Sequence, residues 1–236
     1  MENRKKIITA LRSHLQPFNF VHALWLEGSI AEKDDDIYSD LDIWLSVDDD
    51  MLLSIYDEVE VALKSVAPID YKYVLKRSGE LGHNVYHLKG MNEFLTLDIN
   101  SQKISRNISH RENVDFYEMI FDKSNVIKIE PLKPYTFVKD SQLAEVIEYI
   151  NYMAVNIKKN RLRDRDIESG EYYRAVLQRV VCYLRLKNGK HEKSDFGFKH
   201  IYKDIPADEY SKLTAFYFGE ASDSTLSSLK KWLRSI

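Results

Sequence analysis

Residues 24–29 read LWLEGS, ten residues follow, and residues 40–45 then read DLDIWL. Both runs are rich in aromatic and aliphatic side chains and predict β-strands. Because side chains alternate along a strand, Asp40 and Asp42 project from one face, and the aliphatic residues next to them point to a core. Paired carboxylates repel each other unless a cation compensates them, and Mg²⁺ binds beside one or two carboxylates together with substrate phosphates. The pattern therefore predicts a site for a metal ion and a phosphate group.

Gly28 and Ser29 strengthen this prediction, because an Asp-x-Asp pair alone is more often a solvated pair at a sheet edge. A glycine directly after a strand lets the backbone approach a ligand closely. Ser29 offers a hydroxyl and an N–H at the start of the next segment, where oriented amides attract phosphate oxygens. We expect Gly28 and Ser29 to hold the phosphate tail of the substrate.

A third carboxylate, Asp98, lies in the run FLTLDI at residues 94–99. Aliphatic residues flank it on both sides, so this run also predicts a strand. If that strand neighbours residues 41–47, Asp98 completes a triad that binds metal and accepts a proton from an attacking hydroxyl. Two-metal chemistry uses such carboxylates, with ions about 3.5–4 Å apart.

Other polar residues are left out of the predicted site. His83, His87 and His110 lack the spacing of metal ligands, and we interpret them as polar surface or core residues. The acidic run at residues 34–36 is interpreted as a solvated loop.

The hydrophobic periodicity of the chain changes near residue 138. Before it, β-rich runs alternate with two amphipathic helices, expected at residues 2–15 and directly after the acidic run 48–50. After Pro131 and Pro134, apolar residues recur at three- and four-residue spacing, which predicts helices. The expected strands are residues 20–26, 41–47, 69–76, 84–88 and 94–100.

The C-terminal part is expected to be a helical bundle. Apolar periodicity predicts its helices, and Asn188-Gly189 is a C-cap signal for the second of them. We therefore predict an α/β (α+β) mixed-sheet domain, residues 1–138, followed by an all-α bundle domain, residues 139–236. Apolar residues recur at helical spacing from residue 143 to 157 and from 176 to 184, the latter in a helix expected at residues 175–186. Shorter helices are expected at residues 207–218 and 224–234.

Composition narrows the function classes. The chain has 236 residues, a formal net charge of −3, 44% apolar residues and 12% aromatic residues, which excludes disorder and is enough to bury a core. It lacks the basic excess that non-specific duplex binding needs, so we expect no nucleic-acid partner. Cys182 is the single cysteine and no apolar run reaches 18 residues. We expect a cytoplasmic protein without a membrane partner.

The motif resembles that of the nucleotidyltransferase superfamily typified by DNA polymerase β. That pattern is a hydrophobic residue, Gly and Gly or Ser, then about nine to thirteen residues, then Asp-hydrophobic-Asp or Glu-hydrophobic. Gly28-Ser29, the run 39–43 (SDLDI) and the later Asp98 match it in order. Glu27 and the acidic run 34–36 depart from it, since relatives commonly have an apolar or aromatic residue at the first position and often a Gly in the loop.

In size and layout the chain resembles the aminoglycoside adenylyltransferases of the streptomycin/spectinomycin type, which join such a domain to a helical one. The resemblance implies that Glu171 contacts the bound substrate and that Lys193 contacts the nucleotide. Ser39 belongs to the matching string and is implied in nucleotide binding. Trp232 is a weaker match to an aromatic residue beside the nucleotide.

The resemblance implies transfer of a nucleoside monophosphate, AMP from ATP, to a hydroxyl of a small molecule, with two Mg²⁺ ions and release of pyrophosphate. Asp40, Asp42 and Asp98 would hold metal, and Asp98 would act as the base or orient the acceptor hydroxyl. Gly28 and Ser29 would hold the β- and γ-phosphates. Two alternatives stay open: a toxin-like nucleotidyltransferase that modifies tRNA or protein, and a non-catalytic nucleotide-binding module.

Overall fold

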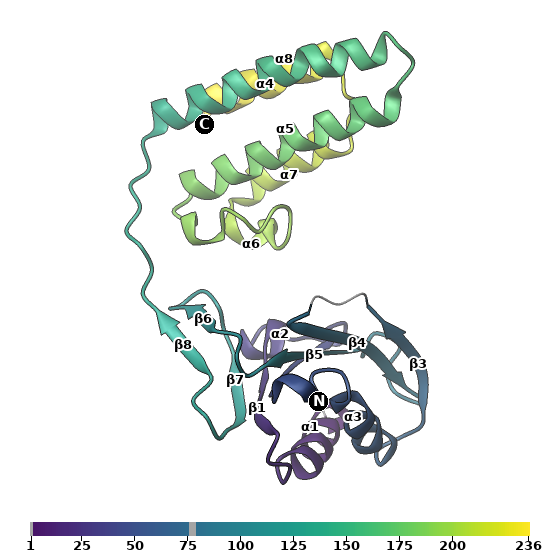
Figure 1. The fold of residues 1–236 in the computed structure, drawn as a ribbon. Helices are drawn as coiled ribbons and strands as arrows, with labels where there is room; N and C mark the ends of the chain where they lie inside the picture. Colours follow the sequence, from purple (N-terminus) through teal and green to yellow (C-terminus); the bar gives the residue numbers. More distant parts are fainter. Residues whose placement is uncertain (1, 76–78) are drawn as a thin grey trace. The chain divides into compact units, whose positions relative to one another are not determined.

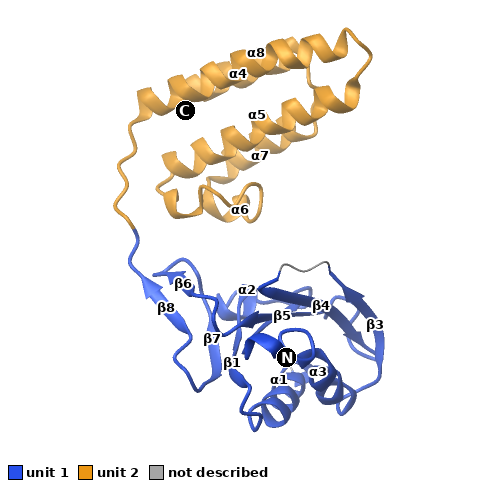
Figure 2. Ribbon diagram, in the orientation of Figure 1, with its two compact units in different colours: residues 1–132 blue, residues 133–236 orange. Residues whose placement is uncertain are grey.

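The computed structural model of the protein describes residues 2–75 and 79–236. The chain divides into two compact units, residues 1–132 (unit 1) and 133–236 (unit 2), as coloured in Figure 2. The predicted domain boundary after residue 138 falls where the first helix of unit 2, α4 (Lys139–Arg161), begins. A mixed α/β unit followed by a helical unit confirms the predicted fold class. Within the described ranges, no helix combines the length and apolar character needed to cross a bilayer.

Unit 1 is built on a six-stranded mixed sheet with the strand order β3-β4-β5-β2-β1-β7 (Figure 1). Strands β2 and β5 run parallel, and the other neighbours are antiparallel. The strands are β1 (Val21–Leu26), β2 (Leu41–Val47), β3 (Ile69–Val74), β4 (Leu81–Leu88), β5 (Leu97–Lys103) and β7 (Glu118–Asp122). The other elements of unit 1 are α1 (Glu2–Leu15), α2 (Gly28–Ala31), a 3₁₀ turn (Asp49–Met51), α3 (Ile55–Lys64), β6 (Ile108–Arg111) and β8 (Ile127–Glu130).

Helices α1 and α3 lie on the same face of this sheet and form the main core of unit 1 (Figure 1). Ile7 and Leu11 of α1 and Val59 and Leu63 of α3 are fully buried there. They pack against alternate aliphatic residues of the central strands, which are Leu41, Ile43, Leu45, Leu97 and Ile99. Because strand side chains alternate, the polar residues between these positions point to the opposite face.

The opposite face of the sheet is divided. Beside β1 it is covered by the two-stranded sheet of β6 and β8, and Trp25, Ile108 and Ile127 are buried there. Trp25 also stacks on Trp44 of β2, with ring centroids 5.9 Å apart. The part of this face over β2, β5 and β4 carries polar side chains and forms the candidate site described below.

Some boundaries of helices and strands differ from the prediction. One reason is that a side chain in a turn accepts the hydrogen bond of a backbone amide. Strand β5 begins at Leu97 rather than at Phe94, because the amide of Phe94 donates to Oδ1 of Asn92 at 3.0 Å in a turn. Strand β3 ends at Val74, and the expected end at Lys76 lies outside the described residues. The short elements α2, α6, β6, β7 and β8 were not predicted.

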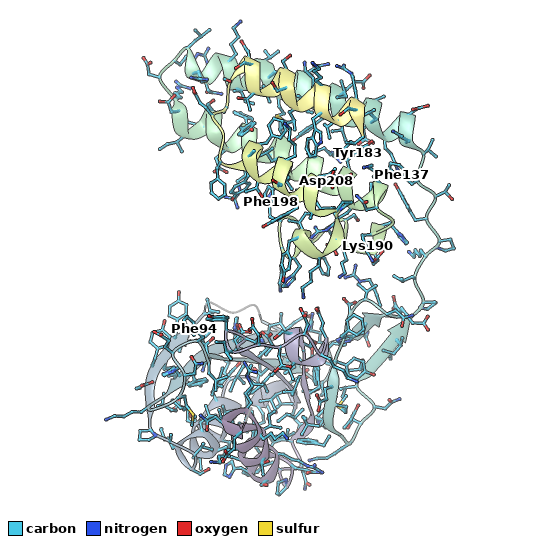
Figure 3. All side chains as sticks on the ribbon, turned by 180° about the vertical axis from the view of Figure 1, so that it is seen from behind. Phe94, Phe137, Tyr183, Lys190, Phe198 and Asp208 are labelled. Atoms are coloured by element: carbon cyan, nitrogen blue, oxygen red, sulfur yellow. The ribbon has the colours of Figure 1, made fainter. Side chains whose placement is uncertain are left out.

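Unit 2 is a helical bundle, and its helices pack around a single apolar cluster. Helices α4 and α5 pack along each other, and α8 packs against α4 (Figure 1). Phe137 and Tyr183, both labelled in Figure 3, meet within this unit with ring centroids 5.9 Å apart. After α4 its elements are α5 (Asp166–Lys187), a 3₁₀ turn (His191–Lys193), α6 (Ile201–Asp204), α7 (Ala207–Tyr217) and α8 (Asp223–Ser235).

A buried ionic network holds the segment after α5 in place. Arg185 and Asp204 have side chains only 0% and 1% exposed, and Nε of Arg185 donates to Oδ2 of Asp204 at 2.8 Å. The same guanidinium donates to the carbonyl oxygens of Gly197, at 2.6 Å, and Lys199. The buried charge is thus paired and hydrogen-bonded within the protein, as burial requires.

Candidate active site

Asp42 and Asp98 are direct neighbours on the central strands of unit 1. Strands β2 and β5 pair in parallel with Asp42 opposite Asp98, and both side chains are half-buried. Adjacent strands lie about 4.8 Å apart, so two like charges stand side by side on the face opposite α1 and α3. This arrangement can bind a cation between two carboxylates.

Gly28 lies against the Asp42 carboxylate. Its φ is +67°, a conformation that side chains disfavour, and a Cβ built on it would lie only 2.0 Å from Oδ2 of Asp42. The amide of Glu27 donates to the backbone carbonyl of Asp42 at 3.1 Å, which keeps the end of β1 next to β2. The absence of a side chain at Gly28 therefore leaves the carboxylate room to face a ligand.

Ser29 has a buried hydroxyl that lacks a partner. Its Oγ is inaccessible to solvent and makes no hydrogen bond with any residue in the described part of the chain. A buried polar atom left in this state costs free energy, roughly 1–3 kcal/mol. Ser29 directly follows Gly28, which lies against Asp42, so this hydroxyl is a candidate donor for an oxyanion bound there.

The loop before β2 is held by a residue that the sequence reasoning missed. Arg4 of α1 donates from Nη1 to Oδ2 of Asp35 and from Nη2 to the carbonyl of Asp36, both at 2.8 Å, and it also donates to the carbonyl of Ser39. The Ser39 hydroxyl donates to Oδ1 of Asp36 at 2.9 Å. This bond and the Tyr38 amide lower the pKa of Asp36. Ser39 is thus part of an ordered loop that leads directly into Asp40.

Asp40 precedes the first residue of β2 and is half-buried. Across residues 2–75 and 79–236, no three His, Cys, Asp or Glu side chains converge as a cluster that could hold a metal ion. Mg²⁺, however, usually binds through one or two carboxylates and completes its shell with water and substrate phosphates. The Asp42–Asp98 pair, in which both residues are half-buried, fits such a partly open site.

His83, which we interpreted as an ordinary polar residue, contacts the third carboxylate. It lies on β4, whose backbone pairs His83 with Asn100 of β5, and its Nε2 is hydrogen-bonded to Oδ1 of Asp98. Asn100 lies 3.4 Å from the same oxygen through Nδ2. The signal that could have found it is alternation: a strand that starts at Leu81 puts His83 on the face of Asp98.

Glu27, the departure from the family motif, also has structural partners. Nε1 of the buried Trp25 lies 2.8 Å from Oε1 of Glu27, and Nε2 of His110 lies 3.1 Å from the same oxygen. His110 is only 7% exposed and packs on the ring of Tyr117. Glu27 thus joins β6 to the end of β1, immediately before Gly28.

Phe94 marks the loop before β5 on unit 1 (labelled in Figure 3). Its ring meets Tyr38 edge-on, with centroids 5.1 Å apart, and both rings are exposed. The pair therefore connects the two loops that precede β2 and β5, the strands that carry Asp42 and Asp98.

The remaining predicted site residues lie in unit 2. Helix α5 begins at Asp166, so Glu171 is exposed in its second turn. Nζ of Lys193 lies 3.6 Å from Oδ1 of the buried Asp204. Trp232 of α8 is partly buried and stacks on Phe216 within the core, with centroids 5.5 Å apart.

Formal charge is divided unevenly between the units. Unit 1 has 15 Lys and Arg against 23 Asp and Glu, a net charge of −8, whereas unit 2 has 19 against 14, a net charge of +5. The near-neutral net charge of the whole chain is therefore the sum of an acidic unit and a basic unit. The electrostatic field of each unit attracts a ligand of opposite charge.

No protein-family model and no curated protein matches the sequence of the chain. Among solved structures, it is similar to a spectinomycin adenyltransferase from Enterococcus faecialis in complex with ATP and spectinomycin, with 12% identity, a TM-score of 0.32, and coverage of 99% of this chain and 98% of that chain. It is also similar to a candidate nucleotidyltransferase from H. pylori, with 12% identity, a TM-score of 0.31, and coverage of 99% and 96%.

Proposed function

We propose that this protein is a nucleotidyltransferase that transfers a nucleoside monophosphate, AMP from ATP, to a hydroxyl of a small molecule and releases pyrophosphate. The observation that carries the proposal is the pairing of Asp42 with Asp98 on adjacent parallel strands, beside Gly28. Two carboxylates side by side on adjacent strands repel each other, and a bound cation relieves that repulsion. The resemblance of the sequence motif adds the reaction class.

In this proposal Asp40, Asp42 and Asp98 hold two Mg²⁺ ions. When bound, the metal lowers the pKa of the acceptor hydroxyl and neutralises the phosphate oxygens. The donor set supports this assignment, because carboxylate oxygens are the ligands that Mg²⁺ prefers. Water and substrate phosphates would complete the coordination shell.

Ser29 and Gly28 would bind the phosphate tail. The unpartnered Oγ of Ser29 is free to donate to a phosphate oxygen, and the absence of a side chain at Gly28 lets the backbone approach it. Ser39 would hold the loop on which Asp40 sits. Lys193 is proposed as a further contact with the nucleotide.

Asp98 would take up the proton. As the acceptor oxygen attacks the α-phosphorus, the O–H proton passes to the Asp98 carboxylate, a P–O bond forms, and the bond to the leaving pyrophosphate breaks. The Asp98 carboxylate lies beside Asp42, so Asp98 can orient the hydroxyl while both carboxylates hold metal. Transfer of the proton to solvent then restores Asp98.

The acceptor is proposed to be a cationic small molecule, for example an aminoglycoside. The net charge of −8 on unit 1 supports this, since an acidic unit attracts a polycation. Glu171 is proposed as an acidic contact for it. The net charge of +5 on unit 2 favours the alternative of an anionic macromolecular acceptor such as tRNA.

The test is pyrophosphate release from purified protein with Mg²⁺, a panel of nucleotides, and separate panels of aminoglycosides and RNA. We expect release with ATP and an aminoglycoside, and a loss of at least ~10²-fold in Asp42→Asn and in Asp98→Asn. Asp57→Asn, an exposed carboxylate on α3, is the matched control and should keep wild-type activity. Release that survives Asp42→Asn would remove the metal assignment. Turnover with RNA alone would support the tRNA alternative, and nucleotide binding without turnover the binding-module alternative.

A further inference from the structure

His83 directly contacts a site carboxylate, that of Asp98. It projects from β4 on the face of the sheet that carries Asp98, one strand away, and its side chain is 29% exposed. An ionised carboxylate only accepts hydrogen bonds, so Nε2 of His83 must donate to Oδ1 of Asp98. The neutral Nε2–H tautomer is sufficient for this bond.

Both contacts of Asp98 converge on one of its oxygens. His83 and, more weakly, Asn100 at 3.4 Å act on Oδ1. Oδ2 accepts no hydrogen bond from any residue described by the structure. A carboxylate held through one oxygen has a restricted χ2 torsion, and its second oxygen keeps a constant direction.

We propose that His83 is a positioning residue that holds Asp98 through Oδ1 and thereby presents Oδ2 to the metal and the acceptor hydroxyl. The inference rests on the function proposed above and deepens it by adding a residue that the motif does not contain. Partners behind a metal ligand fix its orientation, and removing them typically costs ~10–100-fold in metal affinity or activity. His83 would act in this way, without contacting substrate.

His87 provides a control within the same strand. It lies four residues further along β4 and points to the same face, and it too is hydrogen-bonded to an aspartate. That aspartate is Asp70, at 2.7 Å from Nδ1, and Nε2 of His87 lies 3.1 Å from the carbonyl of Asn92. The two histidines therefore differ in whether their carboxylate belongs to the site.

The experiment compares His83→Ala, His83→Gln and His87→Ala in the full-length protein. Pyrophosphate release gives kcat and the KM for ATP, and electron paramagnetic resonance gives the Kd for Mn²⁺ without turnover. For His83→Ala we expect kcat to fall by at least ~10-fold with little change in KM, and the Kd for Mn²⁺ to rise by a similar factor. His83→Gln, whose amide can donate the same bond, should recover most of both losses. His87→Ala should match the wild type.

Each outcome decides the inference. Wild-type kcat and Mn²⁺ affinity in His83→Ala would overturn it, and so would a folded His83→Gln that behaves like the alanine variant. Absence of Mn²⁺ binding by the wild type would also overturn it, because Asp98 would then not be a metal ligand. If the wild type binds Mn²⁺ but transfers nothing, the proposed function fails while the Mn²⁺ comparison between variants still tests His83. A wild-type melting temperature for His83→Gln shows that its result does not reflect unfolding.

Discussion

A buried arginine of unit 2 and a buried serine hydroxyl of unit 1 differ in whether the described residues supply their hydrogen-bond partners. In unit 2, Arg185 is fully buried, and Asp204 and two backbone carbonyls accept its hydrogen bonds. In unit 1, the buried Oγ of Ser29 has no partner in the described ranges, and Asp42 stands beside Asp98 as a like charge. A satisfied network fixes the groups that it joins, whereas an unsatisfied buried group costs free energy that a bound ligand can recover. The comparison therefore identifies the Arg185 network as structural and the Ser29 hydroxyl as a candidate contact for a ligand.

The largest effect is expected when the satisfied network of unit 2 is broken. Arg185→Met leaves Asp204 buried without its main partner, and we expect a loss of ~3–5 kcal/mol in the free energy of unfolding, measured by urea denaturation. Arg179→Met is the control on the same helix. Arg179 is 45% exposed and lies 3.5 Å from Glu145, so its removal should cost less than about 1 kcal/mol. Equal losses would mean that burial and pairing do not distinguish the two arginines.

Gly28→Ala tests the close approach of the backbone to Asp42 in unit 1. The new Cβ would collide with Oδ2 of Asp42 at a positive φ, and we expect a cost of ~2 kcal/mol and a loss of at least ~10²-fold in pyrophosphate release. Gly90→Ala measures the cost of a side chain at positive φ alone, because Gly90 has φ +82° and a Cβ added there would meet no atom within 4 Å. That control should cost ~1 kcal/mol and leave activity intact. Identical behaviour of the two variants would refute a role for the close approach to Asp42.

Ser29→Ala should weaken ATP binding without weakening the fold. Removal of an unpartnered hydroxyl does not destabilise the protein, while loss of one hydrogen bond to phosphate costs ~1 kcal/mol, or ~5-fold in the Kd for ATP measured by calorimetry. Ser46→Ala is matched to it, because Ser46 on β2 is also buried with an unpartnered Oγ in the described structure. The control should leave the Kd for ATP unchanged. An unchanged Kd in Ser29→Ala would exclude this serine from the phosphate site.

The smallest expected effect is the pH dependence of the stabilisation that His87 provides. Burial lowers the pKa of His87, but the hydrogen bonds to Asp70 and to the carbonyl of Asn92 raise it, and the net change is upward from 6.5. The protonated His87 therefore stabilises the folded protein. This stabilisation is complete below the unfolded-state pKa of His87 and disappears as pH rises through its folded-state pKa. We expect His87→Gln to lower the melting temperature slightly at pH 5.5 and less at pH 8.5. A larger loss at pH 8.5 would reverse the sign of this coupling.

Local patterns predicted much of the fold. The strand at residues 41–47 and the helix at residues 2–15 have the predicted bounds, because their alternation or helical spacing is strong. The short strands β6, β7 and β8 were missed because each has too few residues for a clear pattern. The start of β5 was misjudged because the side chain of Asn92 engages the amide of Phe94 in a turn.

The identity of the candidate site residues could also be read from the chain. The order of Gly28, Ser29, Asp42 and Asp98, with their spacing, is a local property and is enough to indicate metal and phosphate chemistry. His83 and Arg4 could not be found in this way. Their contacts join β4 to β5 and α1 to the loop before β2, and such contacts depend on which elements become neighbours.

By itself, the sequence determined which residues are available for chemistry and which face of each strand they occupy, because alternation along a strand is a property of consecutive residues. Only the tertiary structure decided that Asp42 stands directly opposite Asp98, that Gly28 leaves room for a carboxylate, and that the Ser29 hydroxyl is buried with no hydrogen-bond partner among the described residues. The register between β2 and β5 comes from packing of aliphatic side chains more than fifty residues apart in the chain, and no local pattern encodes it.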